Sequence, residues 1–231
     1  MRFLSWPGLG GFSQGIHPPE YKAETASKPI RRLPFAPTLI LPLSQHIGAP
    51  SRPIVNVGQE VVRGEMIAEA VGQMSIPVHA PASGVIKAID LMPGLRGSMQ
   101  KSIVLRVYEG STQEILWGQP RDMSALSPEE IIQAVQDTGM AGLGGAAFPT
   151  HVKFKVPREH KVHTLVVNGC ECEPFLSTDH RVMLEHPEAL IRGIYYAMRA
   201  TGTKKAIVGI ESNKRDAAKV IRNLVAAEDD I

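Results

Sequence analysis

Two neighbouring segments carry residue types and spacings that suit nucleotide binding. The first, Gly142-Leu-Gly-Gly-Ala-Ala-Phe-Pro149, has three glycines in four positions, and Lys153 follows it. Glycine lets backbone N–H groups come close to an anion, and a lysine adds a compensating positive charge. The segment therefore predicts a phosphate-binding loop formed by Gly142, Gly144, Gly145 and Lys153.

The second segment, Asn168-Gly-Cys-Glu-Cys-Glu-Pro174, follows an apolar run and contains two carboxylates, Glu171 and Glu173. An ionised carboxylate only accepts hydrogen bonds, so it suits ribose hydroxyls or a nicotinamide amide. We therefore expect phosphate to bind at the glycine loop and sugar at the acidic segment.

Cys170 and Cys172 are the two cysteines of the chain and lie one residue apart. They cannot link distant parts of a secreted fold, and they fit a reducing, cytosolic compartment. Because cysteine is commonly a small buried hydrophobe, we expect both to pack structurally. A redox pair and a metal pair are the alternatives. The scattered histidines show no spacing typical of a metal site.

The composition limits the classes of function. A chain of 231 residues with 43% hydrophobic content can bury a full core. Lys+Arg at 25 against Asp+Glu at 23 gives a net charge of +2, too small a field to favour nucleic acid. No run approaches the roughly 18 apolar residues that span a bilayer, so we expect a soluble or peripheral protein.

The first half of the chain predicts an arm followed by an all-β module. Residues 1–36 have no sustained periodicity and are expected to pack over their own domain or to dock a partner through Phe3, Leu4 and Trp6. Residues 37–110 contain short β-type runs broken by glycines. The runs are Thr38–Leu43, Val61–Ala70 and Gly84–Ile89.

This module resembles the biotinyl/lipoyl carrier family, a barrel-sandwich hybrid. Carriers present a modifiable lysine at the tip of a hairpin, whereas this chain has Gly72-Gln-Met-Ser75 there, and Lys87 lies beyond the next glycine turn. We therefore expect no covalently attached swinging arm.

After a connector at Gly110–Leu126, residues 127–231 predict an α/β domain. Ser127-Pro128-Glu129-Glu130 is typical of a capped helix start, and Gly139 of a left-handed helix end. A helix thus precedes the glycine loop, whereas the Rossmann fingerprint requires a strand there. The chain does not carry that fingerprint.

Strands and helices alternate in the rest of this domain. Strands are expected at His163–Val167 and Lys205–Ile210, and helices at Pro187–Thr201 and after an N-cap at Asn213. Alternation of this kind predicts a parallel sheet. Only two clear strands are present, so we expect an incomplete domain from a longer protein. Lys214 is expected to be a solvated element end, with a nucleotide contact as the alternative.

These segments, together with Gly15-Ile-His-Pro-Pro19 and Leu43-Ser-Gln-His-Ile-Gly-Ala-Pro50, resemble the N-terminal half of the C subunit of the Rnf electron-transport complex, called Rsx in some bacteria. The glycine loop and the acidic segment are similar to those of the flavin-binding subunit of respiratory complex I. The resemblance implies a barrel-sandwich hybrid followed by part of a flavin-subunit-like α/β domain.

The resemblance also implies a function. Family members oxidise NADH through FMN in NADH:ferredoxin-type electron transfer, and lie peripherally on the cytoplasmic side of the bacterial inner membrane. Their partners are the other Rnf/Rsx subunits, and the complex couples electron transfer to ion translocation. Two 4Fe-4S clusters are expected in the full-length subunit. A four-thiolate cluster cannot be built from two cysteines, so this chain alone is expected to be inactive.

Site residues can be carried over by motif. The three loop glycines would let the backbone approach the flavin or its phosphate, and Lys153 would stabilise the negative charge. Asn168, Glu171 and Glu173 would line the flavin and nicotinamide side. No catalytic residue is expected, because the protein's role is to place two rings.

Two rival interpretations remain. In the first, the chain is a non-catalytic assembly subunit whose barrel and arm dock membrane subunits. In the second, it is the related A subunit of a sodium-translocating NADH:quinone reductase, which has a similar domain plan without clusters.

Overall fold

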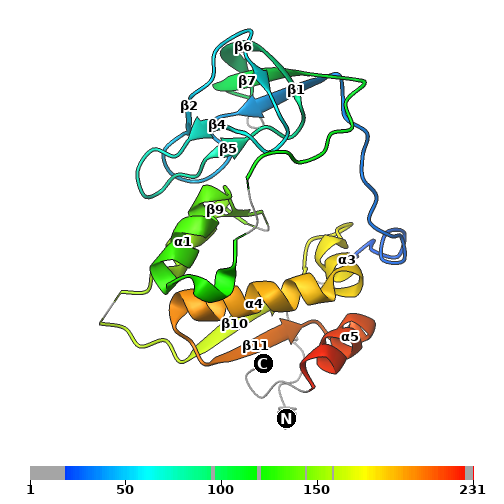
Figure 1. Ribbon diagram of the computed structural model, residues 1–231. Coiled ribbons are helices and arrows are strands. Elements are labelled where there is room, and N and C mark those ends of the chain that lie inside the picture. Colours follow the sequence, from blue (N-terminus) through cyan, green and yellow to red (C-terminus); the bar gives the residue numbers. More distant parts are fainter. Residues whose placement is uncertain (1–18, 95–96, 119–120, 144, 158, 227–230) are drawn as a thin grey trace.

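The computed structural model describes residues 19–231 except 95–96, 119–120, 144, 158 and 227–230. Strands β1–β7 gather at one end of the molecule, and helices α1–α5 with strands β10 and β11 gather at the other (Figure 1). Phe3, Leu4 and Trp6 of the predicted arm, and Gly144 of the glycine loop, lie outside the described residues.

The all-β module consists of two antiparallel sheets, which confirms the predicted barrel-sandwich architecture. The four-stranded sheet has the order β1 (Thr38–Pro42), β7 (Met99–Val107), β6 (Gly84–Pro93), β3 (Glu60–Val61). The three-stranded sheet has the order β2 (Arg52–Pro53), β4 (Met66–Glu69), β5 (Val78–His79).

Buried aliphatic side chains fill the space between these strands, among them Ile67, Ile86, Ile103 and Leu105. The run expected at Val61–Ala70 is divided into two strands, because the chain turns at Gly64, whose φ of +92° favours glycine.

The hairpin tip between β4 and β5 lies against the α/β domain. Gln73 O accepts a hydrogen bond from His151 Nε2 at 2.9 Å, and Ser75 O accepts one from Gln136 Nε2 at 3.2 Å. The segment that bears a lysine in carrier domains is therefore an interdomain contact in this protein.

Helix α1 (Pro128–Asp137) begins as the sequence predicts. Ser127 Oγ accepts from Glu130 N, and the Glu130 carboxylate accepts from Ser127 N at 2.8 Å, so the capping box is complete. Gly139 follows the helix with a φ of +71°, which confirms the left-handed end. The amphipathic helix buries Ile131 and Ala134.

The glycine loop forms a short hairpin. Strand β8 (Ala141–Gly142) pairs with β9 (Phe148–Pro149), and helix α2 (Thr150–Phe154) follows directly. This hairpin and helix α2 were not predicted by the sequence patterns.

The predicted parallel sheet is present as a pair, β10 (Thr164–Gly169) and β11 (Lys205–Ile210), with Thr164 opposite Lys205. Helices α4 (Pro187–Thr201) and α5 (Arg215–Val225) pack around it, and α3 (Thr178–Glu185) packs on α5. Side chains buried in this part include Met183, Ile194, Met198, Ala217, Ile221 and Val225.

The N-cap predicted at Asn213 is wrong. Helix α5 begins at Arg215 with Lys214 in the cap position and without a side-chain cap hydrogen bond. The Asn213 amide instead lies 3.4 Å from the Glu20 carboxylate, so it contacts the N-terminal segment. Among the described residues, no helix combines the length and apolar character needed to cross a membrane.

Candidate functional site

The glycine loop brings a positive charge close to bare backbone. Lys153, on helix α2, places its Nζ 5.9 Å from the centre of the Phe148 ring and 3.3 Å from the point where a Cβ on Gly142 would lie. No atom lies within 4 Å of the corresponding point at Gly145. Lys153 and Gly145 are both exposed, so an anion can reach both groups.

The barrel supports this loop. Ile47 N, in the loop between β1 and β2, donates a hydrogen bond to Ala147 O at 3.2 Å. His151, which follows the loop in α2, is fully buried against the hairpin tip. The loop is thus held between two domains, and its position depends on their contact.

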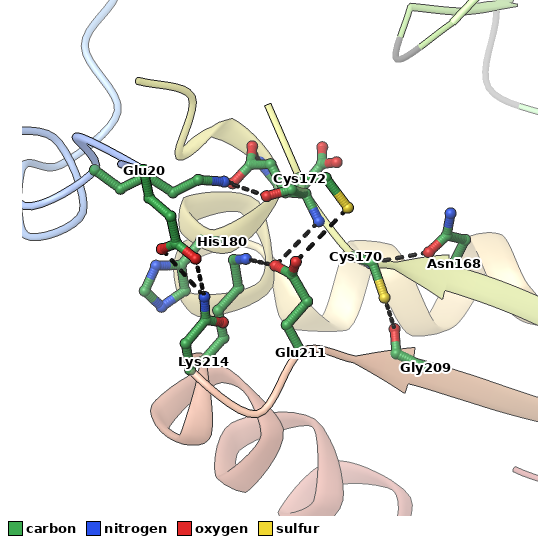
Figure 2. Close-up of polar contacts among 12 residues, drawn as sticks. Glu20, Asn168, Cys170, Cys172, His180, Gly209, Glu211 and Lys214 are labelled. Atoms are coloured by element: carbon green, nitrogen blue, oxygen red, sulfur yellow. Dashed lines mark hydrogen bonds and ion pairs between the residues drawn. The ribbon is translucent and has the colours of Figure 1, made fainter. Parts of the chain in front are cut away.

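The acidic segment begins where strand β10 ends. Asn168 Oδ1 accepts a hydrogen bond from Cys170 N at 3.0 Å, which closes a turn directly after the strand (Figure 2). Cys170 Sγ lies 3.9 Å from Gly209 O, and Cys172 Sγ lies 3.7 Å from Glu211 Oε1, both on or next to strand β11 (Figure 2).

The expected structural packing of Cys170 and Cys172 is wrong, because both cysteines are free and exposed. They lie in the turn beyond the last residue of β10, and connecting segments of this kind run over the surface of a domain. Within the described residues, no three histidine, cysteine, aspartate or glutamate side chains form a group that could hold a metal ion.

Glu171 and Glu173 have opposite environments. Glu171 is 3% exposed, and its Oε1 accepts a hydrogen bond from Asp179 N at 2.8 Å, at the start of helix α3. Glu173 is exposed. Of the two, Glu173 therefore presents its carboxylate to solvent, whereas Glu171 holds helix α3 to the acidic segment.

A set of charged side chains surrounds Glu171. Lys22 Nζ lies 3.9 Å from Glu171 Oε2, and Lys214 forms an ion pair with Glu211. Burial, followed by the charges of Glu171 and Glu173, raises the pKa of Asp179 above its usual range. The end of the parallel sheet is thus acidic and is partly neutralised by the buried Lys214 and the largely buried Lys22.

The expectation that Lys214 is a solvated element end is wrong, because the residue is 2% exposed and its side chain is paired with Glu211. Among the described residues, no hydrogen bond or ion pair joins the glycine loop to the segment from Asn168 to Glu173. The glycine loop and the acidic segment are therefore held in place by separate sets of contacts.

The sequence patterns missed Lys22 and Glu211. Glu211 directly follows strand β11, and the carboxyl ends of adjacent parallel strands meet at one edge, so its position was a usable signal. Lys22 has no such signal, because it reaches the site from an arm 149 residues away in the sequence.

The residues present fit a flavin nucleotide. The phosphate suits the exposed Lys153 and the open backbone at Gly145, and hydroxyl groups suit the exposed Glu173 carboxylate. Glu171 Oε2 is buried without a hydrogen-bond partner in the structure, and Lys22 Nζ lies 3.9 Å from it.

Comparisons with known proteins identify both domains. Residues 10–109 match the RnfC barrel sandwich hybrid domain, and residues 135–231 match the Nuo51 FMN-binding domain. The C subunit of the Na(+)-translocating ferredoxin:NAD(+) oxidoreductase complex of Acetobacterium woodii is 39% identical, over 92% of this chain and 48% of its own length. The C subunit of the ion-translocating oxidoreductase complex of Haemophilus influenzae is 37% identical, over 96% of this chain and 34% of its own length.

This chain therefore spans about half the length of these relatives, or less. Among solved structures, an NAD+-reducing [NiFe]-hydrogenase in the air-oxidized state matches 44% of this chain and 19% of its own chain, with 31% identity and a TM-score of 0.38.

Proposed function

The chain belongs to the RnfC family of C subunits in ion-translocating oxidoreductase complexes, and we propose that it is the part that binds FMN and NADH. One observation carries the proposal: residues 135–231 match an FMN-binding domain, and within them Lys153 lies over a glycine hairpin. The match of residues 10–109 to the RnfC barrel favours this family over the A subunit of a sodium-translocating NADH:quinone reductase.

In this proposal the glycine loop binds the flavin phosphate. Gly145 has open space at its Cβ position, so backbone N–H groups can approach the phosphate oxygens, and Lys153 Nζ supplies a full positive charge. Because Gly142 has no side chain, the Lys153 side chain can lie across the hairpin, with Nζ 3.3 Å from the point where a Cβ would be. Gly144 belongs to the same proposed cradle by its place in the motif.

The acidic segment binds the hydroxyl and amide groups. Glu173 is exposed and can accept from two donors, and Asn168 offers its amide at the end of β10. Glu171, turned inward, acts by holding helix α3 against this segment.

When bound, FMN accepts a hydride from NADH and can pass the two electrons on singly. Two 4Fe-4S clusters of the full-length subunit would be the one-electron acceptors. The subunit is peripheral on the cytoplasmic side of the inner membrane and contacts the other Rnf/Rsx subunits there. This chain alone binds the nucleotides and does not complete the electron transfer.

A fluorescence titration with FMN tests the phosphate assignment. We expect Lys153→Ala to weaken FMN binding about tenfold, since a charge-assisted hydrogen bond contributes roughly 1.5 kcal/mol or more. Lys161→Ala removes an exposed lysine outside the loop and should leave binding unchanged. Equal affinity of Lys153→Ala and the unaltered chain would contradict the phosphate role, and no saturable quenching in either would contradict the proposed function.

A kinetic measurement on the full-length subunit tests Glu173. We expect Glu173→Gln to raise the KM for NADH about five- to tenfold, because the amide accepts more weakly and only through one oxygen. FMN content should not change. The exposed Glu188 on helix α4 gives the control Glu188→Gln. A KM equal to that of the control would remove Glu173 from the nicotinamide side.

Docking of other subunits is a second candidate function, and one observation favours it. The connector after the barrel exposes Ile115, Leu116 and Trp117, with exposed fractions of 67%, 67% and 51%. A chain that only docks would assemble into its complex normally and bind no nucleotide. The FMN titration therefore separates the two functions.

A further inference from the structure

The N-terminal segment at residues 20–30, here called the strap, lies on the α/β domain rather than on the adjacent barrel. In Figure 1 this segment is the blue turn beside helix α3, and the chain rises from it to β1 of the barrel. Phe175 N donates to Glu20 O at 2.9 Å, and Arg181 Nη1 donates to Ala26 O at 3.2 Å. Ile30 N donates to the Glu185 carboxylate at 3.1 Å. The strap is thus hydrogen-bonded to the acidic segment and along helix α3.

Lys22 is the strap residue that reaches the acidic segment. Its side chain is 10% exposed, and Nζ donates to the main-chain oxygen of Glu171 and lies 3.9 Å from Glu171 Oε2. The other carboxylate oxygen of Glu171 accepts from Asp179 N. A single buried carboxylate therefore ties together the strap, the acidic segment and the start of helix α3.

Two residues with strained backbone conformations lie beside the contact between Lys22 and Glu171. The rings of Tyr21 and Phe175 stack with their centres 5.0 Å apart and 7° between their planes. Both residues have positive φ, +48° and +67°, a strained backbone conformation that persists only where the surroundings impose it. The strap supplies those surroundings for Phe175, two residues from Glu173.

The charges make Lys22 necessary for this arrangement. Glu171 is buried close to Asp179 and Glu211, and Lys214 is already paired with Glu211. Removing Lys22 would leave the Glu171 carboxylate buried beside other acids without its cation, which is strongly unfavourable. The segment 170–175 would then have to move so that Glu171 regains water.

We propose that Lys22 is a positioning residue of the nucleotide site, which fixes the buried Glu171 carboxylate and thereby orients the segment that presents Glu173. This inference rests on the proposed function, because it assigns Lys22 to the same site. Lys22 does not contact the nucleotide; it acts through Glu171. The strap is accordingly part of the nucleotide-binding domain, although the barrel lies between the strap and that domain in the sequence.

The test compares three variants of the full-length subunit. Lys22→Met removes the charge and keeps an unbranched side chain, Lys22→Arg keeps the charge, and Lys28→Met removes an exposed lysine from the same strap as a control. The first readout is amide hydrogen exchange at Asp179 and Phe175, which needs no nucleotide. The second is the split between KM for NADH and kcat.

We expect Lys22→Met to speed exchange at both amides and to raise the KM for NADH about tenfold, with kcat within about twofold of the unaltered subunit. Lys22→Arg should restore most of the KM, and Lys28→Met should behave as the unaltered subunit. A purely structural role would lower the fraction of active enzyme, and so the apparent kcat, without raising KM.

A double variant protects the test against misfolding of Lys22→Met. In Glu171→Gln the buried charge is absent, so adding Lys22→Met should raise KM by much less than it does alone. Independent, additive effects would overturn the inference, as would an unchanged KM in Lys22→Met. If the unaltered subunit bound neither FMN nor NADH, the proposed function would fail first and this inference with it.

Discussion

At the scale of single residues, the two carboxylates of the acidic segment have different environments. Glu171 and Glu173 are two positions apart, yet Glu171 is buried and Glu173 is exposed. The difference arises from what the rest of the chain brings to each. Lys22 and the first turn of helix α3 contact Glu171, whereas the Glu173 side chain faces solvent. In the proposed function, the buried Glu171 carboxylate therefore positions the segment and the exposed Glu173 carboxylate binds the nucleotide.

Gln113, in the connector after the barrel, is a second buried polar side chain that holds a segment in place. Its side chain is buried, accepts from Ser83 N at 2.7 Å, and donates to Ser83 O and Tyr108 O at 3.3 Å. These bonds fasten the first residues after the barrel to the loop that precedes β6, where the sequence predicted only a connector.

We expect Gln113→Glu to lower the free energy of unfolding by about 2 kcal/mol, because a carboxylate cannot donate to the two carbonyl oxygens and is buried beside them. Urea denaturation measures the change. The neighbouring exposed residue gives the control Glu114→Gln, which should stay within about 0.5 kcal/mol of the unaltered chain. Equal midpoints for Gln113→Glu and the control would show that the buried amide is dispensable.

At the scale of helices and strands, local signals predicted much of the α/β domain. Helix α4 and strand β11 have the expected bounds. The helix bounds were predictable because Pro187 starts the helix and Gly202, with φ +70°, ends it. The capping box of α1 was equally explicit. Helix α3 was not predicted: Ser177 precedes it, but His180 stands where a capping box needs glutamate or glutamine.

The candidate site was predicted less completely than the elements. The glycine loop and the acidic segment are local motifs, so sequence spacing revealed them. The supports of the site are not local: Lys22 contacts Glu171, and Ile30 contacts Glu185, across about 150 residues of chain. Long-range contacts of this kind leave no periodic pattern, and only the folded structure places them.

The two left-handed helix ends give a matched pair of variants. Gly139 and Gly202 have φ of +71° and +70°, but a Cβ on Gly139 would lie 2.6 Å from Pro77 O of the barrel, whereas nothing lies within 4 Å at Gly202. We expect Gly202→Ala to cost about 1 kcal/mol of unfolding free energy for the backbone alone. Gly139→Ala should cost more, because the barrel must also shift.

Urea denaturation of both variants measures the difference. Because Gly139 precedes the glycine loop, FMN affinity should fall in Gly139→Ala and stay unchanged in Gly202→Ala. If the two variants were equally destabilised, the contact between helix α1 and the barrel would contribute nothing to stability.

At the scale of the whole molecule, the barrel and the α/β domain meet at three histidines. His151 is fully buried on α2 and contacts Gln73 O, His46 is buried in the loop after β1, and His79 lies on β5 close to Gly139. Burial lowers the pKa of both His151 and His79 below the usual 6.5. At His151 the hydrogen bond to Gln73 O opposes this shift, whereas the charges of Lys155 and His46 add to it; at His79 the charge of Asp137 opposes it. The contact between domains therefore favours neutral imidazoles at His151 and His79.

We accordingly expect the stability of the chain to fall as the pH decreases below 6.5. With a lower pKa in the folded state, the unfolded chain binds more protons in the window between that pKa and 6.5, so each histidine contributes a slope of up to about 1.4 kcal/mol per pH unit. We expect His151 to contribute more to this slope than His79. Its Nδ1 is buried without a hydrogen-bond partner, so a proton added to Nδ1 would have no acceptor. Urea denaturation at pH 5.5, 6.5 and 7.5 measures the slope.

A variant that cannot titrate locates the source of this acid sensitivity. His151→Gln keeps an amide that can donate to Gln73 O but cannot take up a proton, so the slope should flatten. The exposed His160 gives the control His160→Gln, which should keep the full slope. A slope as steep in His151→Gln as in the control would mean that the domain contact tolerates a charged imidazole, and the acid sensitivity would then have to arise away from the interface.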